Sequence, residues 1–125
     1  MGGKLSEIEK DFALFKDKAF AIILFGSFAR GEQTERSDVD VCIVAKERKK
    51  IKEIWNEILE SGLTARYDVK IFELLPLKMK IEVIKDGKVI WCRNKGELDY
   101  YFWKYRKIWK DEILQKKKLN LAIYE

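Results

Sequence analysis

The stretch that decides the fold of this chain is AFAIILFGSFARGEQTERSDVDVCIV, residues 19–44. Its apolar run from Ala19 to Phe25 predicts a short, fully buried strand that ends at Gly26. A second strand is predicted from Asp38 to Val44, because β-branched residues at 39, 41 and 43 alternate with Asp38 and Asp40. About twelve residues join the two strands, which is too long for a simple turn. We therefore expect this connection to carry the chemistry of the chain.

Helices and strands alternate on both sides of this stretch. Apolar residues at helical spacing predict an amphipathic helix over residues 5–18: Leu5, Ile8, Phe12 and Phe15. Downstream, the pattern predicts a helix from Ile51 that closes near Gly62, a strand at 66–72, a helix after Pro76, an edge strand at 88–92 and a last helix from Glu97. The helix from Ile51 is expected to bury an apolar face formed by Ile51, Ile54, Trp55, Ile58 and Leu59. The helix after Pro76 is expected to bury Leu77, Ile81 and Ile84.

This order of elements predicts an α/β, or α+β two-layer, fold in which helices pack on a small mixed sheet. We expect a single domain over residues 1–125, with a C-terminal amphipathic aromatic helix at about 97–115.

Composition excludes several classes of site. The 125 residues include 26 basic and 21 acidic side chains, for a net charge of +5, but no histidine, and cysteine only at Cys42 and Cys92. A Ser-His-Asp or Cys-His nucleophile, a zinc finger and a histidine-ligated metal are therefore excluded, and any metal must be bound by oxygen. Because the cysteines are distant, no secretory signal is present and the longest apolar run has seven residues, we expect a cytoplasmic protein with reduced thiols.

Two patterns in the deciding stretch point to phosphate and metal binding. Gly26-Ser27 follows a strand directly, which places backbone N–H groups and a hydroxyl at the start of a helical turn, where phosphate binds. Asp38 and Asp40 project from one face of a strand, and Asp68 lies at the polar phase of the next strand. Each pattern alone also fits an ordinary helix cap or a solvated strand face. Their combination favours a two-metal phosphoryl-transfer site.

The combination resembles a known family. Gly26-Ser27, ten further residues and Asp38-Val39-Asp40 reproduce the signature Gly-Ser-x(10)-Asp-x-Asp of minimal nucleotidyltransferase domains in the DNA polymerase β superfamily. The resemblance covers about residues 20–72 and implies transfer of a nucleoside monophosphate from a nucleoside triphosphate to a hydroxyl, with two Mg²⁺ ions, or Mn²⁺ in their place.

The resemblance also assigns roles to residues. It implies that Asp38, Asp40 and Asp68 are catalytic and bind the metal, and that Gly26 and Ser27 bind the nucleotide. Arg30 is a further candidate for nucleotide binding, although a surface ion pair would explain it equally well.

The same resemblance implies a partner. Stand-alone minimal domains of this superfamily are typically antitoxins of HEPN ribonuclease toxins, to which they attach AMP from ATP at a tyrosine, and we expect this role here. One alternative is a module that binds nucleotide or caps a partner without catalysis, although the presence of all three carboxylates argues against it. Another is an RNA-binding module built on the basic last helix. We instead expect the aromatic residues of that helix to pack: Tyr101, Phe102, Tyr105 and Trp109. Neither nucleic acid nor a membrane is expected as a partner.

Overall fold

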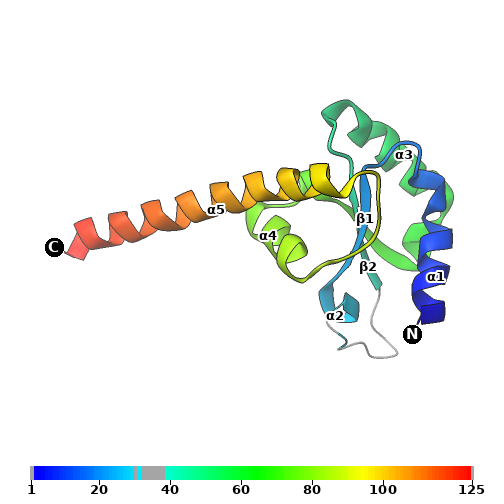
Figure 1. Cartoon of the computed structure of the whole chain (residues 1–125), viewed down its shortest axis with the longest axis horizontal. Helices are drawn as coiled ribbons and strands as arrows, with labels where there is room; N and C mark the ends of the chain where they lie inside the picture. Colours follow the sequence, from blue (N-terminus) through cyan, green and yellow to red (C-terminus); the bar gives the residue numbers. More distant parts are fainter. Residues whose placement is uncertain (1, 30, 32–38, 125) are drawn as a thin grey trace.

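A four-stranded mixed sheet forms the centre of the chain, in a computed structural model that describes residues 2–29, 31 and 39–124 (Figure 1). The strands lie in the order β3-β2-β1-β4, with the bounds Tyr67–Ile71, Val39–Val44, Ala21–Phe25 and Lys88–Cys92. β1 is antiparallel to both β2 and β4, whereas β2 and β3 are parallel. The strand predicted at 88–92 therefore lies at an edge of the sheet, as expected.

Helices cover both faces of the sheet. α1 (Gly2–Asp11) and α3 (Ile51–Ser61) lie on one face, and α4 (Leu77–Asp86) and α5 (Lys95–Tyr124) lie on the other (Figure 1). Successive strand residues point to opposite faces, so β1 contributes Ile22 and Leu24 to the first core and Ala21 and Ile23 to the second. The predicted α/β architecture, a small mixed sheet flanked by helices, is confirmed.

Short turns connect these elements. α2 (Gly26–Ala29) follows β1 directly, and 3-10 turns occupy other connections of the described chain: η1 Ala13–Phe15, η2 Arg48–Lys50, η3 Leu63–Ala65 and η4 Phe72–Leu74. Both cysteine thiols are free, Cys42 in the core and Cys92 half-buried. Within the described ranges, no helix combines the length and the apolar character that a bilayer crossing requires.

The first helix is shorter than the sequence predicts. α1 ends at Asp11, and the η1 turn carries the chain on to β1 instead of a helix that reaches residue 18. The apolar stripe is preserved, because a 3-10 turn also places residues three apart on one side. Ile8, Phe12 and Phe15 are all fully buried as a result.

The two middle helices bury narrower stripes than expected. In α3, Ile54 and Ile58 are buried, but Trp55 and Leu59 are 41% and 57% exposed, since each lies one residue, about 100°, around the helix from the buried stripe. Gly62 closes α3 with φ of 76°, the left-handed conformation expected of a glycine cap. In α4 the buried residue is Val83, whereas the predicted Leu77, Ile81 and Ile84 are only half-buried.

The last helix is longer than predicted. α5 begins at Lys95 and continues to Tyr124, beyond the expected end near residue 115. Its first half packs on the body of the molecule: Leu98 and Phe102 are buried, and Tyr105 lies edge-on to the ring of Phe72. The packing interpretation is therefore confirmed for Tyr101, Phe102 and Tyr105, and stays a prediction for Trp109.

A carboxylate ties α5 to the end of β2. Glu73 accepts the backbone N–H groups of Ala45 and Lys46, both at 2.9 Å, and the hydroxyl of Tyr101 at 2.6 Å. Lys46 has φ of 66°, a left-handed conformation that costs an L residue about 1–2 kcal/mol. The Glu73 carboxylate thus stabilises a strained turn, and burial together with this hydrogen bond raises the pKa of Tyr101 well above its usual range.

Candidate active site

The predicted phosphate-binding turn lies directly against a predicted metal ligand. Gly26 follows the last residue of β1, Phe25, which pairs with Asp40 on β2. Gly26 has φ of 74°, and a Cβ added there would overlap the Oδ2 atom of Asp40. Glycine is therefore required at this position for two reasons: it tolerates the left-handed backbone conformation, and it leaves space for the Asp40 carboxylate.

Two of the predicted carboxylates lie next to each other. The parallel register of β2 and β3 pairs Asp40 with Asp68, so their backbones are about 4.8 Å apart, the usual strand spacing, and their side chains share one face of the sheet. Both residues are half-buried, and the Asp68 side chain is 44% exposed. Together they form an accessible group of oxygen ligands at the edge of the core.

A cation and a thiol occupy the next row on this face. Cys42 pairs with Lys70, two residues further along each strand. The Nζ atom of Lys70 is 3.5 Å from Oδ1 of Asp68, an ion pair in which both side chains are partly exposed. Cys42 is fully buried, and burial raises the pKa of its thiol far above the usual value, so it remains protonated. Cys42 therefore serves packing in the core.

The remaining predicted site residues fall where the structure gives no description. Asp38 and Arg30 lie outside the described residues, and of Ser27 only the backbone, in α2, is described. Within residues 2–29, 31 and 39–124, no three Asp, Glu, Cys or His side chains come together as a metal site. The structure thus brings together Gly26, Asp40 and Asp68, and the roles of all six residues remain predictions.

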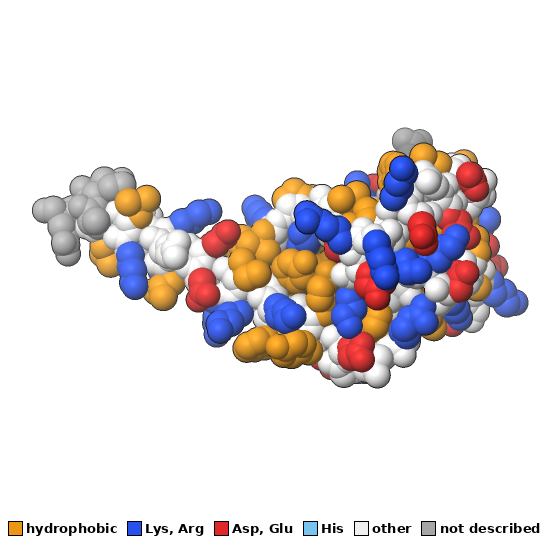
Figure 2. Space-filling view, turned by 90° about the horizontal axis from the view of Figure 1, so that it is seen from above, with side chains coloured by type: hydrophobic (Ala, Val, Ile, Leu, Met, Phe, Trp, Pro, Cys, Tyr) orange, Lys and Arg blue, Asp and Glu red, His pale blue; other side chains and the backbone are white. Residues whose placement is uncertain are grey.

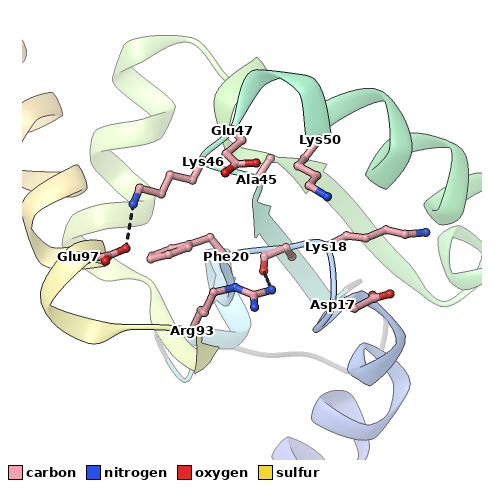
Figure 3. A pocket seen from close by; sticks show the side chains of 10 residues that line it. Asp17, Lys18, Phe20, Ala45, Lys46, Glu47, Lys50, Arg93 and Glu97 are labelled. Carbon is pink, nitrogen blue, oxygen red and sulfur yellow. Dashed lines mark hydrogen bonds and ion pairs between the residues drawn. The ribbon is translucent and has the colours of Figure 1, made fainter.

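A cavity of about 360 Å³ opens at the opposite end of the sheet, beyond the start of β1 (Figure 3). Lys46 lies on one side of it, with its Nζ 4.5 Å from the centre of the Phe20 ring and 3.0 Å from Glu97 Oε2. The lining residues are Asp17, Lys18, Ala19, Phe20, Ala45, Lys46, Glu47, Lys50, Arg93 and Glu97.

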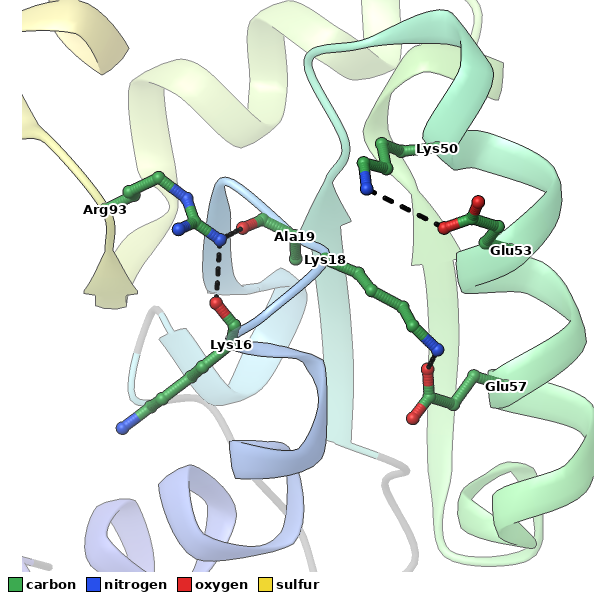
Figure 4. Close-up of polar contacts among 7 residues, drawn as sticks. All are labelled: Lys16, Lys18, Ala19, Lys50, Glu53, Glu57 and Arg93. Atoms are coloured by element: carbon green, nitrogen blue, oxygen red, sulfur yellow. Dashed lines mark hydrogen bonds and ion pairs between the residues drawn. The ribbon is translucent and has the colours of Figure 1, made fainter.

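The other cations of this cavity are also engaged (Figure 4). Arg93 donates to the backbone carbonyls of Lys16 and Ala19, over 2.7 and 3.0 Å. Lys18 pairs with Glu57, a hydrogen bond that raises the pKa of the lysine, and Lys50 lies 3.8 Å from Glu53. These contacts join the chain before β1 to α3 and to the chain after β4, which indicates a structural role. Sequence reasoning missed this set of contacts, because no local motif links residues so far apart.

Comparison with known proteins agrees with the geometry. A family model described as Polymerase beta, Nucleotidyltransferase matches residues 7–96. A protein of Methanocaldococcus jannaschii named "Putative protein adenylyltransferase" is 47% identical over 94 residues, which are 75% of this chain and 72% of the relative. A second protein of that organism, with the same name, is 41% identical over 73 residues, 57% of this chain and 74% of the relative.

Solved structures share the fold. A chain of a toxin–antitoxin crystal structure with AMP-PNP superposes with a TM-score of 0.69 at 19% identity, covering 97% of this chain and 98% of that one. A complex of a tri-AMPylated Shewanella oneidensis HEPN toxin with an MNT antitoxin gives a TM-score of 0.65 at 15% identity, covering 97% of this chain and 96% of that one. At these identities the likeness is one of fold.

Proposed function

This chain belongs to the polymerase β nucleotidyltransferase family, and from that premise we propose that it transfers AMP from ATP to a tyrosine hydroxyl of a HEPN-type toxin, which it neutralises as an antitoxin. The relative at 47% identity supports adenylyl transfer to protein through its name. The toxin–antitoxin complexes that share the fold, one of them with an AMPylated toxin, support the choice of partner.

The observation that carries the proposal is the pairing of Asp40 with Asp68 beneath the Gly26 turn. Two adjacent, partly exposed carboxylates fit Mg²⁺, which binds carboxylates and substrate phosphates together. In this proposal Asp38, two residues before Asp40 in the sequence, supplies the third carboxylate, and the three side chains hold two Mg²⁺ ions or Mn²⁺. When bound, Mg²⁺ would stabilise the negative charge of the phosphoryl group that is transferred.

The turn at the end of β1 would hold the triphosphate. Because Gly26 lacks a side chain, a phosphate can approach its backbone close to the Asp40 carboxylate. The first N–H groups of a helical turn have no partner within the helix and can donate to phosphate oxygens. We assign a further hydrogen bond to the hydroxyl of Ser27 and a charge contact with the phosphates to Arg30.

The proposed reaction is a single displacement at the α-phosphorus. The tyrosine oxygen forms a bond to that phosphorus, the bond from the phosphorus to the α–β bridging oxygen breaks, and pyrophosphate leaves. The proton of the tyrosine hydroxyl passes to the carboxylate of Asp68, whose exposure leaves it accessible from solvent.

A labelling experiment tests this function. The chain is incubated with Mg²⁺, ATP labelled in the α-phosphate and a purified HEPN-type toxin from the same source. We expect the toxin to gain mass in steps of one adenylyl group, and Asp40→Asn or Asp68→Asn to prevent the gain. Asp86→Asn, at the exposed end of α4, is the matched control and should label normally. A stable complex without labelling by any nucleoside triphosphate would instead favour a non-catalytic capping module.

A further inference from the structure

The second half of α5 extends away from the rest of the molecule (Figure 1). Phe102 is buried and Trp109 is half-buried, but every described side chain from Lys110 to Leu121 is exposed. At 1.5 Å per residue, residues 110–124 extend about 22 Å. An isolated helix of this length is only marginally stable in water, so packing against another surface is expected to stabilise it.

α5 carries apolar side chains without cover, four of them on the projecting half: Ile113, Leu114, Leu119 and Leu121. Of the twelve large hydrophobic residues that are exposed in the described chain, seven lie on α5: Tyr100, Trp103, Ile108, Ile113, Leu114, Leu119 and Leu121. Trp103, Leu114 and Leu121 are separated by eleven and seven residues, so they lie along one side of the helix. Figure 2 shows apolar and basic side chains together along this arm.

Basic residues outnumber acidic ones along this helix. Residues 110–124 contain four Lys and two Asp or Glu, an excess of +2, and residues 103–109 add three Lys or Arg and no acidic residue. By the same spacing, Lys110, seven residues after Trp103, lies on the stripe formed by Trp103, Leu114 and Leu121, and Lys117, seven residues further, borders it. A complementary surface is therefore an apolar groove bordered by carboxylates.

The match to the family model does not extend over this helix. It ends at residue 96, so nearly all of α5 lies outside it, although the toxin–antitoxin chain that aligns over 97% of this chain has a counterpart of most of α5. The helix nevertheless has a fixed relation to the candidate site. Leu98 and Phe102 anchor it to the face of the sheet that also carries the side chains of Asp40 and Asp68. A protein held by the projecting half would thus be held on the same face as the carboxylates.

We propose that the projecting half of α5 is the docking helix for the acceptor protein, which receives it in an apolar groove bordered by acidic side chains. This inference rests on the proposed function for the identity of the partner. A second copy of the chain is disfavoured, because pairing two such segments would bring two excesses of positive charge, +2 each, together. RNA is disfavoured because the exposed apolar side chains described in the projecting half, Ile113, Leu114, Leu119 and Leu121, are aliphatic and offer no ring on which a base could stack.

Two double variants test the docking helix, with the purified HEPN protein as probe. Leu114→Ser/Leu121→Ser removes apolar contact, and Lys110→Glu/Lys117→Glu reverses charge beside it. All four side chains are exposed, so the variants should fold. We expect each to weaken the Kd for the HEPN protein by about tenfold or more, as loss of anchor residues does. The affinity for ATP with Mg²⁺, measured by calorimetry, should not change.

Matched controls carry the same changes on other helices. Leu14→Ser/Leu59→Ser and Lys10→Glu/Lys52→Glu alter exposed residues away from α5 and should keep the parent Kd. Parent-like binding by both α5 variants would overturn the proposal. Two other outcomes would also overturn it. In the first, the parent chain forms a dimer without the HEPN protein, and Leu114→Ser/Leu121→Ser abolishes that dimer. In the second, the parent chain binds RNA, and the lysine changes remove RNA binding while toxin binding persists.

The two proposals fail in different ways. If the HEPN protein binds through α5 but is never labelled by ATP, the docking helix stands and adenylyl transfer fails. If both α5 variants label the HEPN protein at the parent rate and bind it with the parent Kd, transfer stands and the docking helix fails.

Discussion

Asp40 and Asp68 occupy paired positions on the parallel strands β2 and β3, with their side chains on one face of the sheet and the Gly26 turn closed over the first of them. This relationship joins three segments that are far apart in the sequence at one end of the sheet. Like charges at this distance repel each other, so the arrangement is more useful for binding a cation than for holding the fold together.

Alanine at Gly26 should abolish nucleotide binding. The substitution forces a left-handed φ on an L residue, at about 1–2 kcal/mol, and its Cβ would displace the Asp40 carboxylate. Gly62→Ala is the matched control, because Gly62 has φ of 76° and open space around it. Both variants should lose similar stability in urea unfolding, and only Gly26→Ala should lose binding of ATP with Mg²⁺ in calorimetry. Equal nucleotide affinity in the two variants would contradict this role of the turn.

Asparagine at Asp40 should leave the metal-free chain as stable as the parent, or slightly more stable. The change removes one of two repelling charges and keeps the shape of the side chain. The variant should lose the stabilisation that ligand gives the parent, about 2.7 kcal/mol at about a hundred times Kd. Urea unfolding with and without Mg²⁺ and ATP measures both effects, with Asp86→Asn as control. A clear loss of stability without ligand would make Asp40 a structural residue.

Removal of the Lys70 charge should strengthen metal binding in the absence of nucleotide. The ammonium lies 3.5 Å from Asp68 and competes with any cation that binds there. Because an exposed ion pair contributes about 0.2–1 kcal/mol, Lys70→Gln should tighten the Kd for Mn²⁺ by at most about fivefold. Titration followed by electron paramagnetic resonance measures it, and Lys78→Gln on α4 is the control. Weaker Mn²⁺ binding would mean that Lys70 instead orients the carboxylate.

The centre of the candidate site could be predicted from the sequence because its residues obey local rules. Gly26 ends an apolar strand, and Asp40 and Asp68 each take the polar phase of a strand, which fixes the face on which they project. Their direct pairing could not be predicted in the same way. It depends on β2 and β3 being adjacent, parallel and in register, and these are properties of the whole sheet.

Features that depend on distant contacts were missed for the same reason. Glu73 accepts the backbone N–H groups of Ala45 and Lys46, from which it is separated by 28 and 27 positions in the sequence. No local motif encodes a contact over such a separation. The sequence predicts too early an end for α5, because three consecutive lysines, residues 116–118, interrupt its apolar pattern. Trp55 is exposed because the side of α3 that faces the sheet is centred on other residues. Amphipathic spacing predicts the orientation of a helix about its axis only approximately.

Alkaline pH should destabilise the chain partly through Tyr67. Burial and the hydrogen bond that its hydroxyl donates to Asp11 raise the pKa of Tyr67 to about 12, from 10.0. The folded chain therefore holds this proton more tightly than the unfolded chain, so the contribution is complete below pH 10.0 and is lost as pH rises through about 12. Tyr67→Phe should be less stable at neutral pH, and the difference from the parent should shrink across that interval. Parallel stability curves for the two proteins would contradict this account.

Loss of the Glu73 carboxylate should destabilise the fold and loosen α5 together. Glu73→Ala leaves the N–H groups of Ala45 and Lys46 and the hydroxyl of Tyr101 without their acceptor. A hydrogen bond to a charged group contributes about 1.5–3 kcal/mol, so the loss should exceed that of an exposed-surface change such as Glu82→Ala. Hydrogen exchange should show faster exchange at Lys46 and in the first half of α5, since the same carboxylate holds both. Faster exchange at Lys46 with α5 unchanged would mean that Leu98 and Phe102 fix the helix without help, and that the carboxylate serves only the left-handed turn.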